Sequence, residues 1–118
     1  MKFSASLKGN SAFRRLYAKG KSAAAPALVV YFRKNGARLN RVGVTVTSKL
    51  GKAVQRNRVR RRLREIYRLN EDRLRPGLDI ILVARTRARF VSYAELDRAF
   101  LDLCGKLGLL VDSSKKLP

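Results

Sequence analysis

Residues 41–84 read RVGVTVTSKL GKAVQRNRVR RRLREIYRLN EDRLRPGLDI ILVA, two strand patterns separated by a helix pattern. In residues 41–47 three valines alternate with glycine and threonine, which predicts a strand with one buried face. From about residue 52 to residue 69 the apolar residues recur at helical spacing. After a Pro-Gly break, residues 78–84 are apolar on both faces, as in a central strand covered on two sides. Parallel pairing of these strands would make a βαβ unit, for which a right-handed crossover is the general expectation.

The N-terminal part of the chain predicts one helix before this unit. The helix begins at Asn10 or Ser11, either of which could cap its first backbone donors, and it ends at Gly20. With 118 residues the chain has the usual size of a single domain. Residues 1–9 and 112–118 are expected to be flexible tails of that domain.

Further elements complete the predicted fold. Residues 21–26 are small and irregular, and residues 28–32 form a strand rich in β-branched and aromatic residues. The Asn35-Gly36 turn signal then leads into residues 41–47, so these two strands are expected to pair as an antiparallel hairpin. A capping box opens a last helix over residues 92–107. The order predicts an α+β fold, a two-layer α/β sandwich whose mixed sheet is covered on at least one face by helices.

The charge of the chain indicates a polyanionic partner. Lys and Arg number 28 against 8 Asp and Glu, which gives a formal net charge of +20. Such an excess favours nucleic acid over an acidic membrane surface as the partner. The 46% of hydrophobic residues exclude a merely disordered basic tail. No apolar run is long enough for a membrane span and no secretory signal is visible, so the cytoplasm is the expected location.

The composition argues against catalysis by this chain. It has no histidine and one cysteine, so a histidine general base and a Cys/His zinc site are both excluded. Cys104 falls in the apolar pattern of the last helix and is expected to be buried. The adjacent acids Glu71 and Asp72 are interpreted as a solvated pair at a helix end rather than half of a two-metal site. We therefore expect no catalytic residue and no metal ligand in the chain.

The helix over residues 52–69 carries the clearest functional signal. Its apolar residues share one side, so the arginines must occupy the rest of its circumference. Arginine is a planar, rigid donor that can grip successive phosphates bidentately. The alternative is a solvated basic helix that binds no polyanion. This alternative does not explain why the helix carries so many charges that repel one another. This helix is therefore a candidate surface for a polyanion, with Arg60 and Arg62 beside its apolar stripe and Arg56 at its start.

Residues Lys49 to Glu65 resemble the signature region of the bacterial ribonuclease P protein, centred on Arg56-Asn57-Arg58. The resemblance covers most of the chain, from about Ser11 to Leu107. It implies the element order αβββαβα and a left-handed crossover around the basic helix, in contrast to the general expectation. Further matching positions are Phe13, Tyr17, Gly20, Tyr31, the run from Arg41 to Val44, Ala84 and Arg85.

The resemblance also implies a function. In that family the RNA subunit hydrolyses precursor tRNA with bound magnesium and removes its 5′ leader, while the protein assists. The partners expected for this chain are the catalytic RNA and precursor tRNA, with magnesium in the holoenzyme and no obligate protein partner. By this resemblance the basic-helix residues that would face the catalytic RNA are Arg56, Asn57, Arg58, Arg60, Arg61 and Arg62. A cleft for the single-stranded leader would be formed by Phe13, Tyr17, Tyr31, Ser48, Lys49, Lys52 and Arg85.

Two alternatives concern the cleft and the function. Phe13, Leu16 and Tyr17 could simply dock the first helix on the core, without any contact to RNA. Where the family often has two adjacent lysines this chain has Ser48-Lys49, and Thr86 stands where a lysine is common. A ribosomal or other structural RNA-binding protein shares the charge, whereas an autonomous nuclease or a DNA-binding module fits the residues less well.

Overall fold

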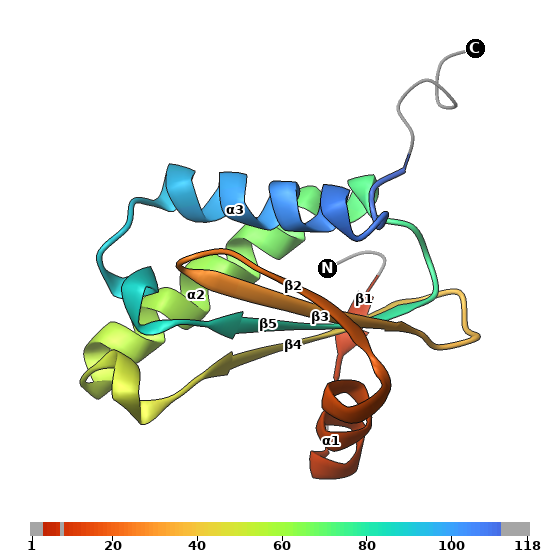
Figure 1. Cartoon of the computed structure of the whole chain (residues 1–118), viewed down its shortest axis with the longest axis horizontal. Helices are drawn as coiled ribbons and strands as arrows, with labels where there is room; N and C mark the ends of the chain where they lie inside the picture. Colours follow the sequence, from red (N-terminus) through yellow and green to blue (C-terminus); the bar gives the residue numbers. More distant parts are fainter. Residues whose placement is uncertain (1–3, 8, 112–118) are drawn as a thin grey trace.

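The computed structural model describes residues 4–7 and 9–111, which form a mixed five-stranded sheet with helices on both faces (Figure 1). The strands lie in the order β1-β4-β5-β3-β2. In the described chain the strands are β1 (Ser4–Ser6), β2 (Lys21–Ala24), β3 (Leu28–Lys34), β4 (Asn40–Val46) and β5 (Leu78–Ala84). The helices are α1 (Asn10–Lys19), α2 (Ala53–Asn70) and α3 (Tyr93–Lys106), with 3₁₀ turns η1 (Ser48–Leu50), η2 (Glu71–Arg73) and η3 (Thr86–Arg89). The α+β class is confirmed.

Strand β5 is the centre of the sheet, as its sequence predicts. It pairs in parallel with β4 and antiparallel with β3, and Ile80, Ile81 and Leu82 are fully buried. The expected hairpin between β3 and β4 is therefore wrong, because β5 lies between them. A strand that is apolar on both faces needs two neighbours and two covered faces, and this requirement outweighs the local turn signal at Asn35-Gly36. The parallel βαβ pairing is confirmed, while the hand of the crossover stays a prediction.

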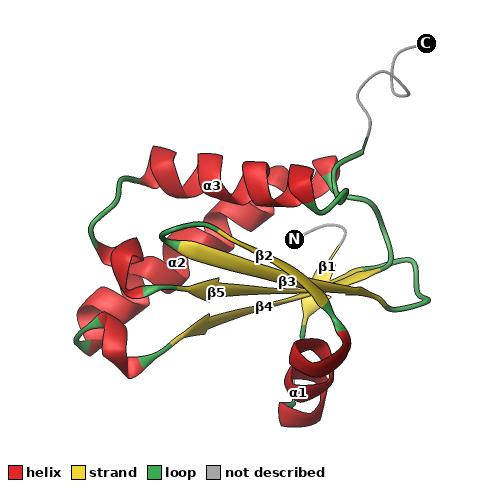
Figure 2. Cartoon of the chain, in the orientation of Figure 1, coloured by secondary structure: helices red, strands yellow, loops and turns green. Residues whose placement is uncertain are grey.

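The two faces of the sheet carry separate hydrophobic clusters. Figure 2 shows α2 and α3 on one face and α1 on the other. The larger cluster lies under α2 and α3 and includes Val30 and Val42, with Val44 and Val46 packed against it. The smaller cluster joins Leu16 of α1 to Ile81 and the partly buried Tyr31. Tyr31 and Phe32 thus point to opposite faces, and the alternation predicted for residues 41–47 is confirmed.

Several terminal features differ from the expectations. Ser4–Ser6 form β1, which pairs in parallel with β4, and Leu7 is buried, so residues 4–7 are not a flexible tail. Residues 1–3, 8 and 112–118, which include the rest of the predicted tails, lie outside the described residues. Residues 21–24 are a strand, not an irregular segment, because they pair with β3 along its free edge. The N-cap of α1 is Gly9, not Asn10 or Ser11.

No helix in the described part of the chain has both the length and the apolar character needed to cross a membrane.

Candidate nucleic-acid interface

Helix α2 is fixed to the body of the protein by its apolar side. Val59, Leu63, Ile66 and Tyr67 are buried in the larger cluster. The Tyr67 hydroxyl lies 2.6 Å from Ser4 Oγ, which links α2 to strand β1. At the start of the helix, Gln55 Oε1 accepts a hydrogen bond from the Lys52 backbone N–H at 2.8 Å. These contacts hold the helix against the repulsion between its arginines.

The six candidate RNA-binding residues of α2 do not share one face. Asn57, Arg60 and Arg61 line a groove on the β1 and α1 side of the helix. Arg60 Nη1 donates to Asn57 Oδ1 at 2.9 Å, so the asparagine orients a neighbouring guanidinium. Arg62 reaches the opposite way, where its Nη1 lies 3.4 Å from the Val91 carbonyl oxygen. Arg58 is exposed, and Arg56 is partly buried at the first turns of the helix.

The groove between α2 and α1 has a volume of about 740 Å³ and combines an apolar floor with a cationic wall. Leu7, Phe13 and Val42 contribute to the floor. Arg64 and Arg68 extend the wall beyond the residues that the sequence singled out. Arg68 forms a two-bond ion pair with Glu65, with N–O distances of 2.6 and 3.2 Å. That pair lowers the pKa of the Glu65 carboxyl, so the single acid of the wall is ionised and neutralises Arg68.

The structure brings the three predicted aromatic residues together where α1 meets the sheet. The rings of Tyr17 and Tyr31 are 4.9 Å apart and nearly perpendicular, and the rings of Phe13 and Tyr17 are 6.5 Å apart. Tyr17 Oη lies 3.3 Å from Thr45 Oγ1. We call Phe13, Tyr17 and Tyr31 the aromatic cluster.

Packing of α1 on the core does not require the whole aromatic cluster. Leu16 is 2% exposed and anchors the helix, whereas Tyr17 remains 40% exposed. Phe13 lies directly over Gly43, where an added Cβ would be 2.6 Å from its Cζ. Sequence reasoning did not identify this role of Gly43, although a glycine inside a regular strand is a signal of close approach.

The polar candidates of the cleft lie beyond the C-terminal ends of β4 and β5. Ser48, Lys49 and Lys52 follow β4 in η1 and at the start of α2, and Arg85 follows β5 directly. All four are exposed. Arg85 is tied to the body of the protein, because its Nη1 donates to the Ala25 carbonyl oxygen at 3.3 Å. The aromatic residues therefore lie over the middle of the sheet face, and the cations lie just beyond the C-terminal ends of β4 and β5.

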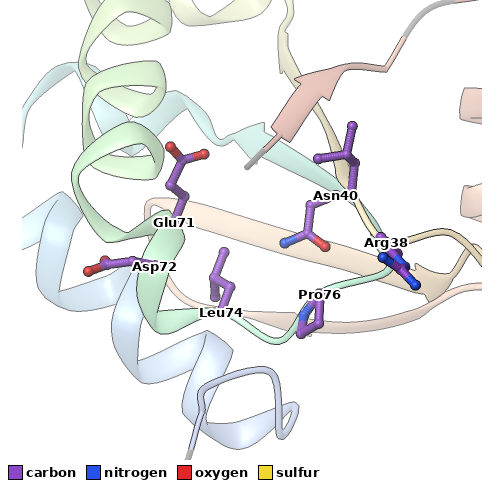
Figure 3. A pocket seen from close by; sticks show the side chains of 7 residues that line it. Arg38, Asn40, Glu71, Asp72, Leu74 and Pro76 are labelled. Atoms are coloured by element: carbon purple, nitrogen blue, oxygen red, sulfur yellow. The ribbon is translucent and has the colours of Figure 1, made fainter. Parts of the chain in front are cut away.

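A smaller pocket of about 230 Å³ lies at the opposite end of the sheet, among Arg38, Asn40, Glu71 and Pro76 (Figure 3). Asn40 has a structural role there, since it donates to Arg75 O at 3.1 Å and accepts from Leu78 N–H at 2.8 Å. Glu71 is only 7% exposed, so the expectation of a solvated acidic pair is wrong for this residue. Within the part of the chain that the structure describes, no three His, Cys, Asp or Glu side chains group as metal ligands.

Comparison with known proteins identifies the family. The family model described as Ribonuclease P matches residues 1–108. The ribonuclease P protein component of Alkaliphilus oremlandii is 46% identical over 104 residues, covering 88% of this chain and 91% of that protein. The corresponding protein of Clostridioides difficile is 43% identical over 98 residues, covering 82% of this chain and 86% of that protein.

Solved structures agree with this assignment. The RNase P protein of Staphylococcus aureus superposes with a TM-score of 0.82 at 29% identity, covering 92% of this chain and 98% of that one. The RNase P protein from Thermotoga maritima superposes with a TM-score of 0.76 at 33% identity, covering 82% and 92%. These matches cover most of the chain, and the chain belongs to the bacterial ribonuclease P protein family.

Proposed function

We propose that this chain acts as the protein subunit of a ribonuclease P holoenzyme, which removes the 5′ leader of precursor tRNA. In this proposal α2 binds the catalytic RNA and the aromatic cluster, with the cations beyond it, binds the leader. The observation that carries it is the rigid mounting of the arginine-rich turns of α2 beside a partly exposed set of aromatic rings, of which Phe13 shares the groove with Arg60 and Arg61 while Tyr17 and Tyr31 lie outside it. Two distinct surfaces are what a protein needs in order to hold two RNAs at once.

The α2 surface suits a folded RNA. Arg58 and Arg61 are exposed and make no hydrogen bond or ion pair with the described residues, so both guanidinium groups are available for phosphates. Arg60, oriented by Asn57, adds a donor of fixed direction. Arginine forks bind phosphate oxygens bidentately and release condensed counterions, so the complex should weaken steeply as the salt concentration rises.

The aromatic cluster suits a single strand of variable sequence. Aromatic faces stack bases of any identity, and nearby cations follow the backbone without reading the sequence. Leaders of different precursors differ in sequence and have in common only that they are single-stranded. Binding that does not depend on base sequence therefore suits this substrate. Ser48, Lys49, Lys52 and Arg85 supply the polar and cationic part of the path.

Hydrolysis itself is assigned to the RNA subunit, with magnesium held by the RNA. Among the described residues, no three His, Cys, Asp or Glu side chains come together as metal ligands. This chain would bind, orient and neutralise charge, and we place the assembly in the cytoplasm. A ribosomal or other structural RNA-binding role is not favoured, because the family match covers residues 1–108 of the chain.

Reconstitution tests the proposal. The purified protein is combined with a bacterial ribonuclease P RNA, and leader removal from precursor tRNA is measured at low magnesium concentration. The protein should raise the rate with the RNA present and should cleave nothing when RNA-free. Cleavage by the RNA-free protein, or no effect of the protein on the RNA-catalysed rate, would contradict the proposal.

A further inference from the structure

Phe90 is the most exposed of the large hydrophobic residues in the described chain, at 74%, and Val54 follows at 73%. Phe90 directly follows η3, and Val54 is in the first turn of α2. The turns η1 and η3 pack against each other and against α2. Both turns lie beyond the arrowheads of β4 and β5, at the left-hand end of the view in Figure 1. The two residues therefore belong to one end of the molecule.

Arg89 is stacked on the Phe90 ring and held there by the backbone of a neighbouring turn. Its guanidinium carbon is 4.7 Å from the ring centroid. Its Nη1 also donates to the Leu50 carbonyl oxygen at 3.0 Å. Gly51 keeps room for this contact, since an added Cβ would lie 2.9 Å from the same nitrogen. The pair is thus oriented before any ligand binds.

The backbone under this pair is also fixed. Ala88 is fully buried in the larger cluster. The Phe90 N–H donates to the Arg87 carbonyl oxygen at 3.0 Å, and the Ala88 N–H donates to the Arg85 carbonyl oxygen at 2.8 Å. The exposed ring therefore stands on a rigid turn rather than on a loose loop, which reduces the entropy lost when a ligand covers it.

The charge around the ring selects the chemistry of the partner. Residues 48–56 and 85–91, which meet at this end, contain no acidic residue. They contain six basic residues: Lys49, Lys52, Arg56, Arg85, Arg87 and Arg89. An aromatic face with a stacked guanidinium and surrounding cations favours a nucleobase with its phosphates over an apolar protein surface.

We propose that Phe90 and Arg89 form a stacking platform for an unpaired base of the precursor tRNA leader, beyond the cations that follow β4 and β5. This inference rests on the proposed function and adds a residue pair to the leader path. The strands indicate the route. Thr45, which contacts Tyr17, continues along β4 to Lys49, and Ile81, which pairs with Tyr31, continues along β5 to Arg85. A leader that follows the sheet reaches the platform after these cations.

The test compares Phe90 variants in the reconstituted holoenzyme, using precursor tRNAs with a long leader and with a short leader trimmed to the nucleotide next to the cleavage site. Phe90→Ala should weaken binding of the long-leader precursor by about tenfold, the loss of one stacked base. Phe90→Leu should bind the long-leader precursor as weakly as Phe90→Ala does, because leucine keeps the apolar bulk but has no aromatic ring. Phe90→Trp should restore the affinity, and the short-leader precursor should bind all variants alike.

Leu39→Ala provides the matched control, because Leu39 is also an exposed hydrophobic residue, at 51%, and precedes β4 at the other end of the sheet. It should leave both affinities unchanged. The platform is overturned if Phe90→Ala leaves long-leader binding intact, or if Phe90→Leu binds as well as the wild-type protein. The platform is also overturned if Phe90→Ala weakens binding of both precursors equally, or if it weakens assembly with the catalytic RNA. Either result would mean that the ring contacts another RNA segment.

Failure of the platform is distinguishable from failure of the proposed function. If only the platform is wrong, the wild-type protein still improves precursor binding by the catalytic RNA, and Phe90→Ala improves it to the same degree. If the proposed function is wrong, the wild-type protein itself gives no improvement with either leader.

Discussion

Gly43 supports the aromatic cluster from below, because the Phe13 ring occupies the space where any other residue would carry its Cβ. The sequence predicted that Gly43 and Thr45 lie on the face opposite the valines, and this placement is confirmed. It could not show that α1 crosses that face at Gly43, since the crossing depends on contacts between residues far apart in the chain. The same limit hid the contact between Tyr17 and Thr45.

Gly43→Ala should displace the Phe13 ring and lower the free energy of unfolding by about 1–3 kcal/mol, the usual range for an overpacked site. The backbone at Gly43 does not have a positive φ, so the cost is steric. Chemical denaturation measures it. In a Phe13→Ala background the same substitution should cost clearly less, because the clashing ring is absent. Equal costs in the two backgrounds would show that Gly43 and Phe13 are not coupled.

Helix α2 is held in place by its buried residues although its positive charges repel one another. Its buried residues pack on the sheet, and the Glu65–Arg68 pair relieves only part of the repulsion. The amphipathic pattern predicted this helix to within one residue at each end. It did not predict that Arg62 faces Val91 while Asn57 and Arg60 face the groove, because that division depends on what packs beside the helix.

Arg58→Ala with Arg61→Ala should reduce the salt dependence of binding to the catalytic RNA. If each arginine contacts one phosphate, the slope of log K against log salt should become shallower by roughly 1.5. Filter binding at several potassium concentrations gives this slope. Stability should not fall, since neither guanidinium bonds to the described residues. Lys106→Ala on α3 serves as the control, and an unchanged slope for the α2 variant would contradict the assignment.

Helix α3 contains the single cysteine, and burial raises the pKa of the Cys104 thiol to about 12. In the unfolded chain the thiol ionises near pH 9, so between there and about pH 12 the unfolded state loses a proton that the folded state keeps. Stability should therefore fall as the pH rises through this window. Cys104→Ala should lose stability less steeply over the same range, by urea denaturation. Parallel slopes for the two proteins would show that the thiol makes no contribution.

The strands show where local sequence patterns are insufficient. Strand β5 was predicted correctly because its run of apolar residues is independent of its neighbours. The local patterns missed strands β1 and β2, because Ser4–Ser6 and Lys21–Ala24 are short and polar or small, and pairing with β4 and β3 alone makes them strands. The order αβββαβα implied by the family resemblance does include three strands between α1 and α2, and it lacks only β1. The β3–β4 hairpin was wrong for a related reason: adjacent strands in sequence need not be adjacent in the sheet.

At the scale of the whole molecule, a net charge of +20 on 118 residues causes electrostatic repulsion that destabilises the folded state. The described structure offsets little of this charge internally: it contains ion pairs between Arg41 and Asp79 and between Arg68 and Glu65. The unbalanced cations extend over α2 and over the end formed by η1 and η3. A polyanion on these surfaces would relieve the repulsion and stabilise the protein.

The free protein should become more stable as salt is added, although its RNA complexes become weaker. Raising a chloride salt to about 1 M shortens the Debye length to about 3 Å and screens the repulsion. The melting temperature should rise by about 4 °C or more, which corresponds to roughly 1 kcal/mol for a domain of this size. Circular dichroism melting curves measure the change. A melting temperature that is constant or falls with salt would show that self-repulsion is negligible in the fold.

The most direct test of the two-surface account measures two equilibria for two variants: assembly with the catalytic RNA, and binding of precursor tRNA by the assembled holoenzyme. Arg58→Ala with Arg61→Ala should weaken assembly and leave precursor binding nearly unchanged at saturating protein. Tyr17→Leu with Tyr31→Leu should leave assembly unchanged and weaken precursor binding only when the leader is present. Losses of similar size in both equilibria for both variants would contradict the separation of the two surfaces.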